Sequence, residues 1–315
     1  MEDKINNEIK DNSYKNIKSK YILQQIFYNL NENKLLHIVK YNKDIQKELE
    51  KGINDYKNYK KVIIEIIPIN LRDKNYFINY KEDENQYYHI YFNDEKEEKH
   101  RYYFIKDENV TKIKIIIDEN IKSFKELFES DCIEKINFIK FNRKDINNMS
   151  YMFCECRSLK ELNFNNFNTN NVTNMRFMFY YCVSLKELNL KNFNTNNITD
   201  MSYMFKGCLS LKKLNFNNFN TYNVTDMNSM FSNCLSLEEL NLNNFDTNRV
   251  TDMGHMFSKC WSLKELNINN FNFNYVTNIY GMFSKCSEEL KNKIRNLNLN
   301  IKKEAFKEEN EEEDL

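Results

Sequence analysis

A 26-residue repeat occupies the chain between Asp145 and Cys286, and this period limits what the chain can fold into. Cysteines stand at positions 156, 182, 208, 234, 260 and 286, each 26 residues after the last. The clearest copy runs from Asn223 to Asn248. One unit of this length cannot enclose a core, so successive units are expected to stack and bury a shared one.

Each unit combines a strand phrase with a return segment. The strand phrase, Leu-x-x-Leu-x-Leu-x-x-Phe, starts at Leu185 in its clearest form and alternates as one face of a strand does. The return segment starts at Val172 in the same unit and places Val, Met, Met, Phe and Cys at spacings of three and four. These spacings predict a short helix. Thr173 and Asn174 can cap its free N–H groups.

The repeat wording resembles that of the BspA-like leucine-rich repeat proteins. It reads V-T-D-M-x-x-M-F-x-x-C-x-S-L-x-x-L-N-L-x-x-F-x-T, and the same residue types recur at several of these positions from one repeat to the next. The expected fold class is therefore an α/β repeat solenoid of the leucine-rich-repeat type, with parallel strands on one face and short helices on the other. The resemblance implies a surface-exposed protein that attaches to proteins or cells, an adhesin.

The remaining segments have different patterns. We expect a helical module at 1–60, a small β region at 61–118 with period-two apolar runs, and the repeats at 119–286, with the first one degenerate. Ser287 suits the N-cap of a capping helix at 287–300. Residues 301–315 form an acidic tail that we expect to be disordered.

The helical module resembles an F-box, which docks on the adaptor of a cullin-type ubiquitin ligase. The resemblance lies between Ile17 and Val39 and rests on Ile22, Ile26 and Phe27, although the leading Leu-Pro and trailing Trp of that module are missing. It implies a substrate receptor that holds its substrate on the repeats. A three-helix cap without a partner is the alternative.

Composition argues against several classes of function. Lys plus Arg and Asp plus Glu are 46 each, so no net field attracts nucleic acid or an anionic membrane. No phosphate-binding loop is present, and no catalytic, cofactor-binding or metal site is predicted. His255 and Trp261 depart from the repeat but have no evident partner. The N-terminus shows no signal peptide, and no stretch of the sequence approaches the roughly 18 apolar residues of a membrane span, so we expect a cytoplasmic protein.

The repeated cysteines are interpreted as buried free thiols. Parallel strands would place them about 4.8 Å apart in a row, whereas a disulfide needs Cβ atoms about 3.8 Å apart and zinc needs a tetrahedron. They then pack as small apolar side chains.

Protein recognition is the expected function, and two rows of residues are candidates. The first is a fixed asparagine that alternates with the core leucines, at Asn163, Asn189, Asn215, Asn241 and Asn267. These amides either bind a partner or bond to one another along the stack. The second row is aromatic and lies on the return segment, at Tyr151, Phe177 and Tyr203. Such residues anchor interfaces, or they pack between neighbouring turns.

Overall fold

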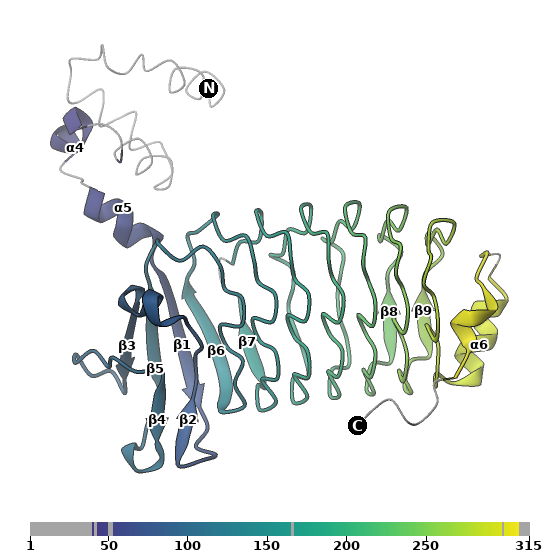
Figure 1. The fold of residues 1–315 in the computed structure, drawn as a ribbon, viewed down its shortest axis with the longest axis horizontal. Coiled ribbons are helices and arrows are strands. Elements are labelled where there is room, and N and C mark those ends of the chain that lie inside the picture. Colours follow the sequence, from purple (N-terminus) through teal and green to yellow (C-terminus); the bar gives the residue numbers. More distant parts are fainter. Residues whose placement is uncertain (1–39, 41–42, 50–52, 165–166, 298, 309–315) are drawn as a thin grey trace. The chain divides into compact units, whose positions relative to one another are not determined.

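In the computed structural model (Figure 1) the chain divides into two compact units, Met1–Lys61 and Val62–Leu315. The structure describes residues 40, 43–49, 53–164, 167–297 and 299–308. Within the first unit the described helices are α4 (Lys43–Leu49) and α5 (Ile53–Lys60). The F-box-like segment, with Ile22, Ile26 and Phe27, lies outside the described residues. No helix of the described ranges is long and apolar enough to cross a membrane.

The second unit starts with a five-stranded sheet in the order β3-β5-β1-β6-β7. Its strands are β1 (Val62–Pro68), β3 (Tyr88–Phe92), β5 (Ile113–Ile117), β6 (Ile133–Lys140) and β7 (Glu161–Asn163). Alternate residues of β1, β3 and β5 are buried, as the period of two predicts. A second sheet pairs β2 (Lys74–Tyr76) with β4 (Tyr103–Ile105), and short 3₁₀ helices lie at η2 (Glu82–Tyr87) and η3 (Lys106–Glu108).

Strand β6 joins the β region to the repeats. It pairs antiparallel with β1 on one side and, on the other, parallel with β7, the strand of the first full repeat. The division that we expected between residues 118 and 119 therefore falls inside one sheet and one core.

The buried Arg143 ties the chain on both sides of that point. Its guanidinium donates to the carbonyls of Asp118, Glu119 and Ile121, and its Nε donates to Asp145 at 2.9 Å. Burial alone would raise the pKa of Asp145, but hydrogen bonds from Arg143 and Lys122 lower it to about 2.

The repeats stack as successive turns, which Figure 1 shows as a row between β6 and α6. On the strand side, β8 (Glu239–Asn241) pairs in parallel with β9 (Glu265–Asn267), and Glu187 bridges Lys213. On the opposite side, parallel bridges join each turn to the next from Ser123 to Asn278. The degenerate first unit also belongs to this stack, because the N–H of Phe128 donates to the carbonyl of Met152 in the next turn.

The return segments are not helical, which corrects our expectation of short helices on that face. Alternate N–H groups donate to the next turn: those of Tyr151 and Phe153 bond to the carbonyls of Arg176 and Met178. The N–H groups between them close tight bends within their own turn. Two residues per turn adopt positive φ, such as Tyr151 at 57° and Glu155 at 54°, and this conformation interrupts a right-handed helix.

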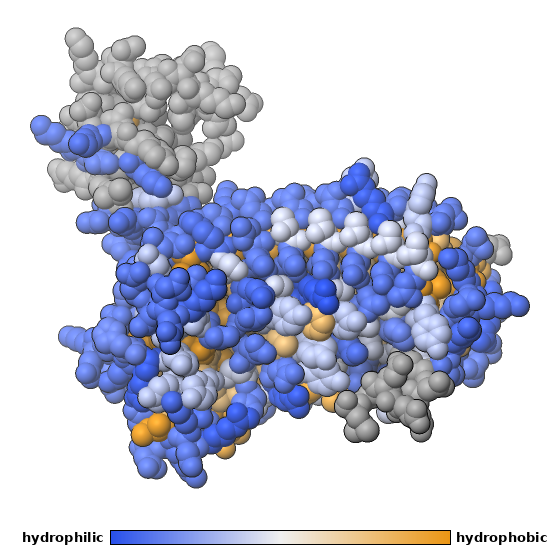
Figure 2. All heavy atoms as spheres, viewed as in Figure 1, coloured by the Kyte–Doolittle hydropathy of each residue, from blue (hydrophilic) through white to orange (hydrophobic). Residues whose placement is uncertain are grey.

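The repeat positions of Leu, Met, Phe and Cys that we predicted to face inward are confirmed as the core. One phenylalanine per turn stacks on the next from Phe128 to Phe283, with ring centroids 5.4–5.8 Å apart. All eight cysteines of the sequence are buried free thiols. From Cys156 to Cys286 each repeat thiol donates to a phenylalanine carbonyl of the turn before. In Figure 2 hydrophilic residues cover most of the visible repeat surface.

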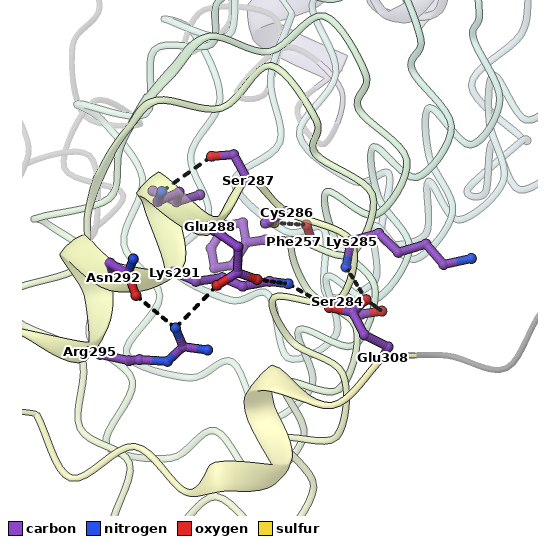
Figure 3. Close-up of polar contacts among 11 residues, drawn as sticks. Phe257, Ser284, Lys285, Cys286, Ser287, Glu288, Lys291, Asn292, Arg295 and Glu308 are labelled. Atoms are coloured by element: carbon purple, nitrogen blue, oxygen red, sulfur yellow. Dashed lines mark hydrogen bonds and ion pairs between the residues drawn. The ribbon is translucent and has the colours of Figure 1, made fainter.

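The C-terminal end of the stack is closed by two segments (Figure 3). Helix α6 (Glu288–Arg295) starts after Ser287, whose Oγ accepts the N–H of Leu290. The 3₁₀ helix η4 (Lys303–Phe306) then supplies carbonyls to the last turn, where Gly281 and Phe283 donate to Glu304 and Ala305. Residues 301–308 are thus an ordered strap, which corrects our expectation of a disordered tail from 301; residues 309–315 lie outside the described ranges.

Candidate functional site

A groove with a volume of about 1240 Å³ runs along the strand side of the turns. Its lining extends from Lys135 and Asn137 at one end to Glu265 and Asn267 at the other, and it includes the whole fixed asparagine row. Leucines of the strand phrase form the floor; Leu162, Leu214 and Leu266 are partly exposed there. The groove therefore offers a long strip of amides and charges over an apolar floor.

The fixed asparagines hold their own turns. In Asn189, Asn215, Asn241 and Asn267 the Oδ1 accepts the N–H of the residue two positions later, at 2.9–3.3 Å. This is an Asx turn, in which a side chain replaces a backbone acceptor. In the described part of the chain no hydrogen bond links one of these amides to the next, so the amide ladder that we considered is not formed.

The Asx turns leave the amide nitrogens available. Because each Oδ1 is bound to its own backbone, the Nδ2 group of the same side chain has a fixed orientation. Within the described ranges these four Nδ2 groups donate to no protein atom, and Asn189, Asn215 and Asn241 are exposed. The asparagine row therefore combines a structural role with a row of free donors in the groove.

Charges at the groove are largely paired between turns. The ion pairs are Lys135 with Glu161 at 2.5 Å, Lys213 with Glu239 at 2.6 Å and Lys293 with Glu265 at 2.9 Å. Among the described residues Lys186, Glu187 and Lys212 form no ion pair, and all three are exposed in the groove lining. The middle of the groove is thus where charges are free to meet a partner.

The aromatic row on the return segment is a stack of parallel rings. The ring centroids of Tyr151 and Phe177 are 4.6 Å apart and those of Phe177 and Tyr203 are 4.4 Å apart, with interplanar angles of 6° and 5°. The guanidinium of Arg176 lies 4.9 Å from the Phe177 ring. All three rings are half-buried and all three residues have positive φ, which is costly for aromatic side chains. Packing between turns accounts for the stacking, and the exposed edges form an accessible surface.

A row of carboxylates lies at the start of the return segments. Asp200, Asp226 and Asp252 occupy equivalent positions, and each accepts the N–H of the residue two positions later. Burial raises the pKa of Asp226, and the neighbouring Asp200 and Asp252 raise it further. Asn228 and Asn278 donate to Asp252, so these carboxylates act as structural acceptors. In the described ranges no group of three metal-ligating side chains is arranged to hold a metal ion.

Three Asn-x-Thr sequences in the repeats, which start at Asn171, Asn197 and Asn223, match the acceptor pattern for N-glycosylation. The Nδ2 groups of Asn171, Asn197 and Asn223 donate to a carbonyl of the preceding turn at 2.6–2.8 Å. The nitrogen that a glycan would modify is therefore already a hydrogen-bond donor within the fold.

Sequence reasoning passed over a third group of residues, at the loop edge where each turn enters the return segment. Tyr222, Arg249 and Tyr275 replace the asparagines found at equivalent positions of other turns. Tyr222 is 50% exposed and Tyr275 is 63% exposed. The signal was available as a departure from the repeat wording, as it is at His255 and Trp261. Of those two, His255 packs against Tyr280 at 5.5 Å and Trp261 is exposed.

Comparison with curated proteins gave no match. A crystal structure of a leucine-rich repeat protein from Bacteroides ovatus is similar at 17% sequence identity and a TM-score of 0.25, over 50% of this chain. The chain spans 45% of the length of that protein.

A family model matches the repeat region in two consecutive stretches. It is described as "Mycoplasma protein of unknown function, DUF285", and it matches residues 122–215 and 210–310. These stretches start within the degenerate first unit and end just beyond the C-terminal strap, so the model covers the stacked turns and their cap. Since they make up more than half of the 315 residues, the chain belongs to the DUF285 family.

Proposed function

We propose that this protein is a non-enzymatic scaffold that binds another protein in its strand-side groove. The observation that carries the proposal is the row of oriented amide nitrogens above a partly exposed leucine floor. Amide donors can bond to the carbonyls and side-chain oxygens of a polypeptide, while the leucines contribute apolar contact area.

The balance of charge supports a protein ligand over a nucleic acid. The groove lining carries both Lys and Glu, and most of these are neutralised by pairs between turns. Nucleic-acid binding draws most of its affinity from many unpaired cations that contact phosphates. A polar protein segment fits this surface better.

The aromatic row is the alternative binding face of the same scaffold. Tyr151, Phe177 and Tyr203 lie on the return side, and their half-exposed edges could anchor a partner there. The two binding faces can be distinguished, because substitutions in the groove and substitutions in the aromatic row should each abolish binding of the partner at their own face only.

Cross-linking capture from cells that express the protein tests these two faces. We expect the groove variant Glu187→Lys/Lys212→Glu to lose the partner, because both side chains are exposed and the exchange leaves net charge unchanged. The aromatic variant Tyr203→Ser uses the residue found at the equivalent position 229. Thr225→Lys, on an exposed position outside the groove, is the control.

The proposal requires capture that survives Thr225→Lys and fails in the groove variant. Equal capture by the wild type and the groove variant would refute the groove assignment. Loss only in Tyr203→Ser would move the binding face to the aromatic row.

A further inference from the structure

The loop-edge cluster consists of Tyr222, Arg249 and Tyr275, which lie on consecutive turns of the stack. Residues at this edge are asparagine in the other full repeats, at positions 170, 171, 196, 197, 223, 248 and 274. Three departures from one repeated residue, all on exposed positions of adjoining turns, form a single surface.

Two of these departures remove a bond that holds turns together. Asn171, Asn197 and Asn223 each donate from Nδ2 to a carbonyl 27 residues earlier, at 2.7, 2.6 and 2.8 Å. Arg249 and Tyr275 occupy the next two positions of that series. Neither side chain makes the equivalent bond to a carbonyl in the described structure; Arg249 bonds to side chains of the preceding turn instead, whereas Tyr275 leaves its turn without this contact.

The guanidinium of Arg249 is instead held in place on the surface. It lies 4.4 Å from the centre of the Tyr222 ring, its NH2 group donates to the Tyr222 hydroxyl at 3.2 Å, and its NH1 group donates to Asn223 Oδ1 at 3.1 Å. Among the described residues no carboxylate forms an ion pair with Arg249. The positive charge is therefore oriented and has no counter-charge within the described fold.

Stability of the fold does not account for the whole cluster. At Arg249 the asparagine bond is exchanged for a ring contact and two exposed hydrogen bonds to the preceding turn, so that position by itself is not destabilised. Tyr275 is 63% exposed and forms no ring contact within the described ranges, so it gives up the asparagine bond without a replacement. Exposed tyrosines beside an arginine are instead the composition of interface hot spots.

We propose that the loop-edge cluster is a docking site for an acidic segment of a partner protein. A carboxylate can accept the remaining N–H groups of Arg249 in a forked pair, which is strong and directional. The rings of Tyr222 and Tyr275 contact the flanking residues of that segment and exclude water from the pair. This surface is separate from the strand-side groove and stands independently of it.

The repeat itself provides the variant that tests the site. Arg249→Asn restores the consensus residue, whose amide can donate to the carbonyl of Tyr222 in place of the bonds of Arg249, so we expect a melting temperature close to that of the wild type. The probe is a fluorescent hexaglutamate peptide, with hexalysine as the negative control, measured by anisotropy at low salt. We expect Arg249→Asn to weaken hexaglutamate binding by about tenfold or more, and Arg249→Lys to weaken it less.

Equal hexaglutamate affinity for the wild type and Arg249→Asn would overturn the proposal, as would the absence of measurable binding to the wild type. Inorganic phosphate that binds the wild type through Arg249 when hexaglutamate does not would also overturn it, since the ligand would then be a phosphate. The groove variant Glu187→Lys/Lys212→Glu should keep full affinity, which distinguishes this site from the groove.

Discussion

At the scale of single residues, asparagine has a more definite role than its abundance suggests. In the full repeats Asn or Asp stands at three fixed corners, represented by Asn174, Asn194 and Asn189. At each of these three it accepts the N–H of the residue two positions later. These Asx turns replace backbone acceptors where the chain changes direction. The asparagine phases are therefore part of the fold, although a surplus of Asn, Lys and Ile also suits an AT-rich coding sequence.

The buried thiols give a residue-scale prediction. Cys208 donates to the carbonyl of Phe179 at 3.1 Å, and burial raises its pKa from the usual 9.0 to about 12. The unfolded chain ionises near pH 9 while the folded chain keeps the proton, so stability that is present below pH 9 is lost as pH rises toward 12. Urea midpoints at pH 7 and pH 10 should show this loss, and Cys208→Ala should reduce it.

At pH 7 we expect Cys208→Ala to lower the free energy of unfolding by about 1 kcal/mol through the lost hydrogen bond. Thiol reagents should label the six repeat cysteines only after denaturation. Rapid labelling of the native protein would contradict the buried row.

At the scale of elements, the return segment shows where a sequence pattern can mislead. Apolar residues three and four positions apart lie on one buried face of a helix. The same residues are also buried when the segment forms tight bends that bond to the neighbouring turns. The N–H of Phe179 has an acceptor on the next turn, the carbonyl of Met204, so no acceptor four residues earlier is needed. The positive φ of residues such as Lys259 could not be predicted from the sequence, because glycine, the usual sign of this conformation, is rare at those positions.

The C-terminal strap gives an element-scale prediction. The carboxylate of Glu308 accepts the N–H of Lys285 and pairs with the buried ammonium of Lys291 at 2.5 Å (Figure 3). We expect Glu308→Gln to reduce stability by about 1–2 kcal/mol, since the Glu308 side chain is half exposed although Lys291 is buried. The exposed Glu304→Gln is the matched control and should have little effect.

The strap should also weaken in acid. Burial acts to raise the pKa of Glu308, but its bonds to Lys291 and to the N–H of Lys285 lower it below the usual 4.5. Its stabilisation is therefore present above pH 4.5 and is lost as pH falls below that value. Melting temperatures of the wild type and Glu308→Gln between pH 7 and pH 3 should converge; a constant difference would contradict this role.

At the scale of the whole molecule, buried hydrophobic residues from Val62 to Ala305 belong to one core. Strand β6 is the connection, because Phe138 pairs with Ile64 of β1 while its ring contacts Phe153 and Phe164 in the turns. Stacked repeats are coupled to their nearest neighbours, so a short stack fused to a sheet should unfold cooperatively.

Phe138→Ala tests this coupling. We expect a loss of about 3–5 kcal/mol, since the side chain is fully buried. The sole tryptophan of the sequence, Trp261, lies several turns away and reports on the far repeats. Its fluorescence transition in urea should shift together with the circular dichroism transition, and Ile139→Ala, at an exposed neighbour, should shift neither. An unmoved tryptophan transition would show that the far turns unfold independently.

The sequence by itself determined the period, the stacking and the inward phases, because hydrophobic burial depends mainly on which side chains recur at which spacing. It also located the asparagine and aromatic rows. Only the tertiary structure decided that the return segments bend instead of forming helices, that residues 301–308 close the stack, and that the Asn oxygens are bound while their nitrogens are free. Each of these depends on which acceptor a neighbouring turn or segment presents. A hydrogen-bond partner from a distant part of the chain leaves no mark in the local sequence pattern.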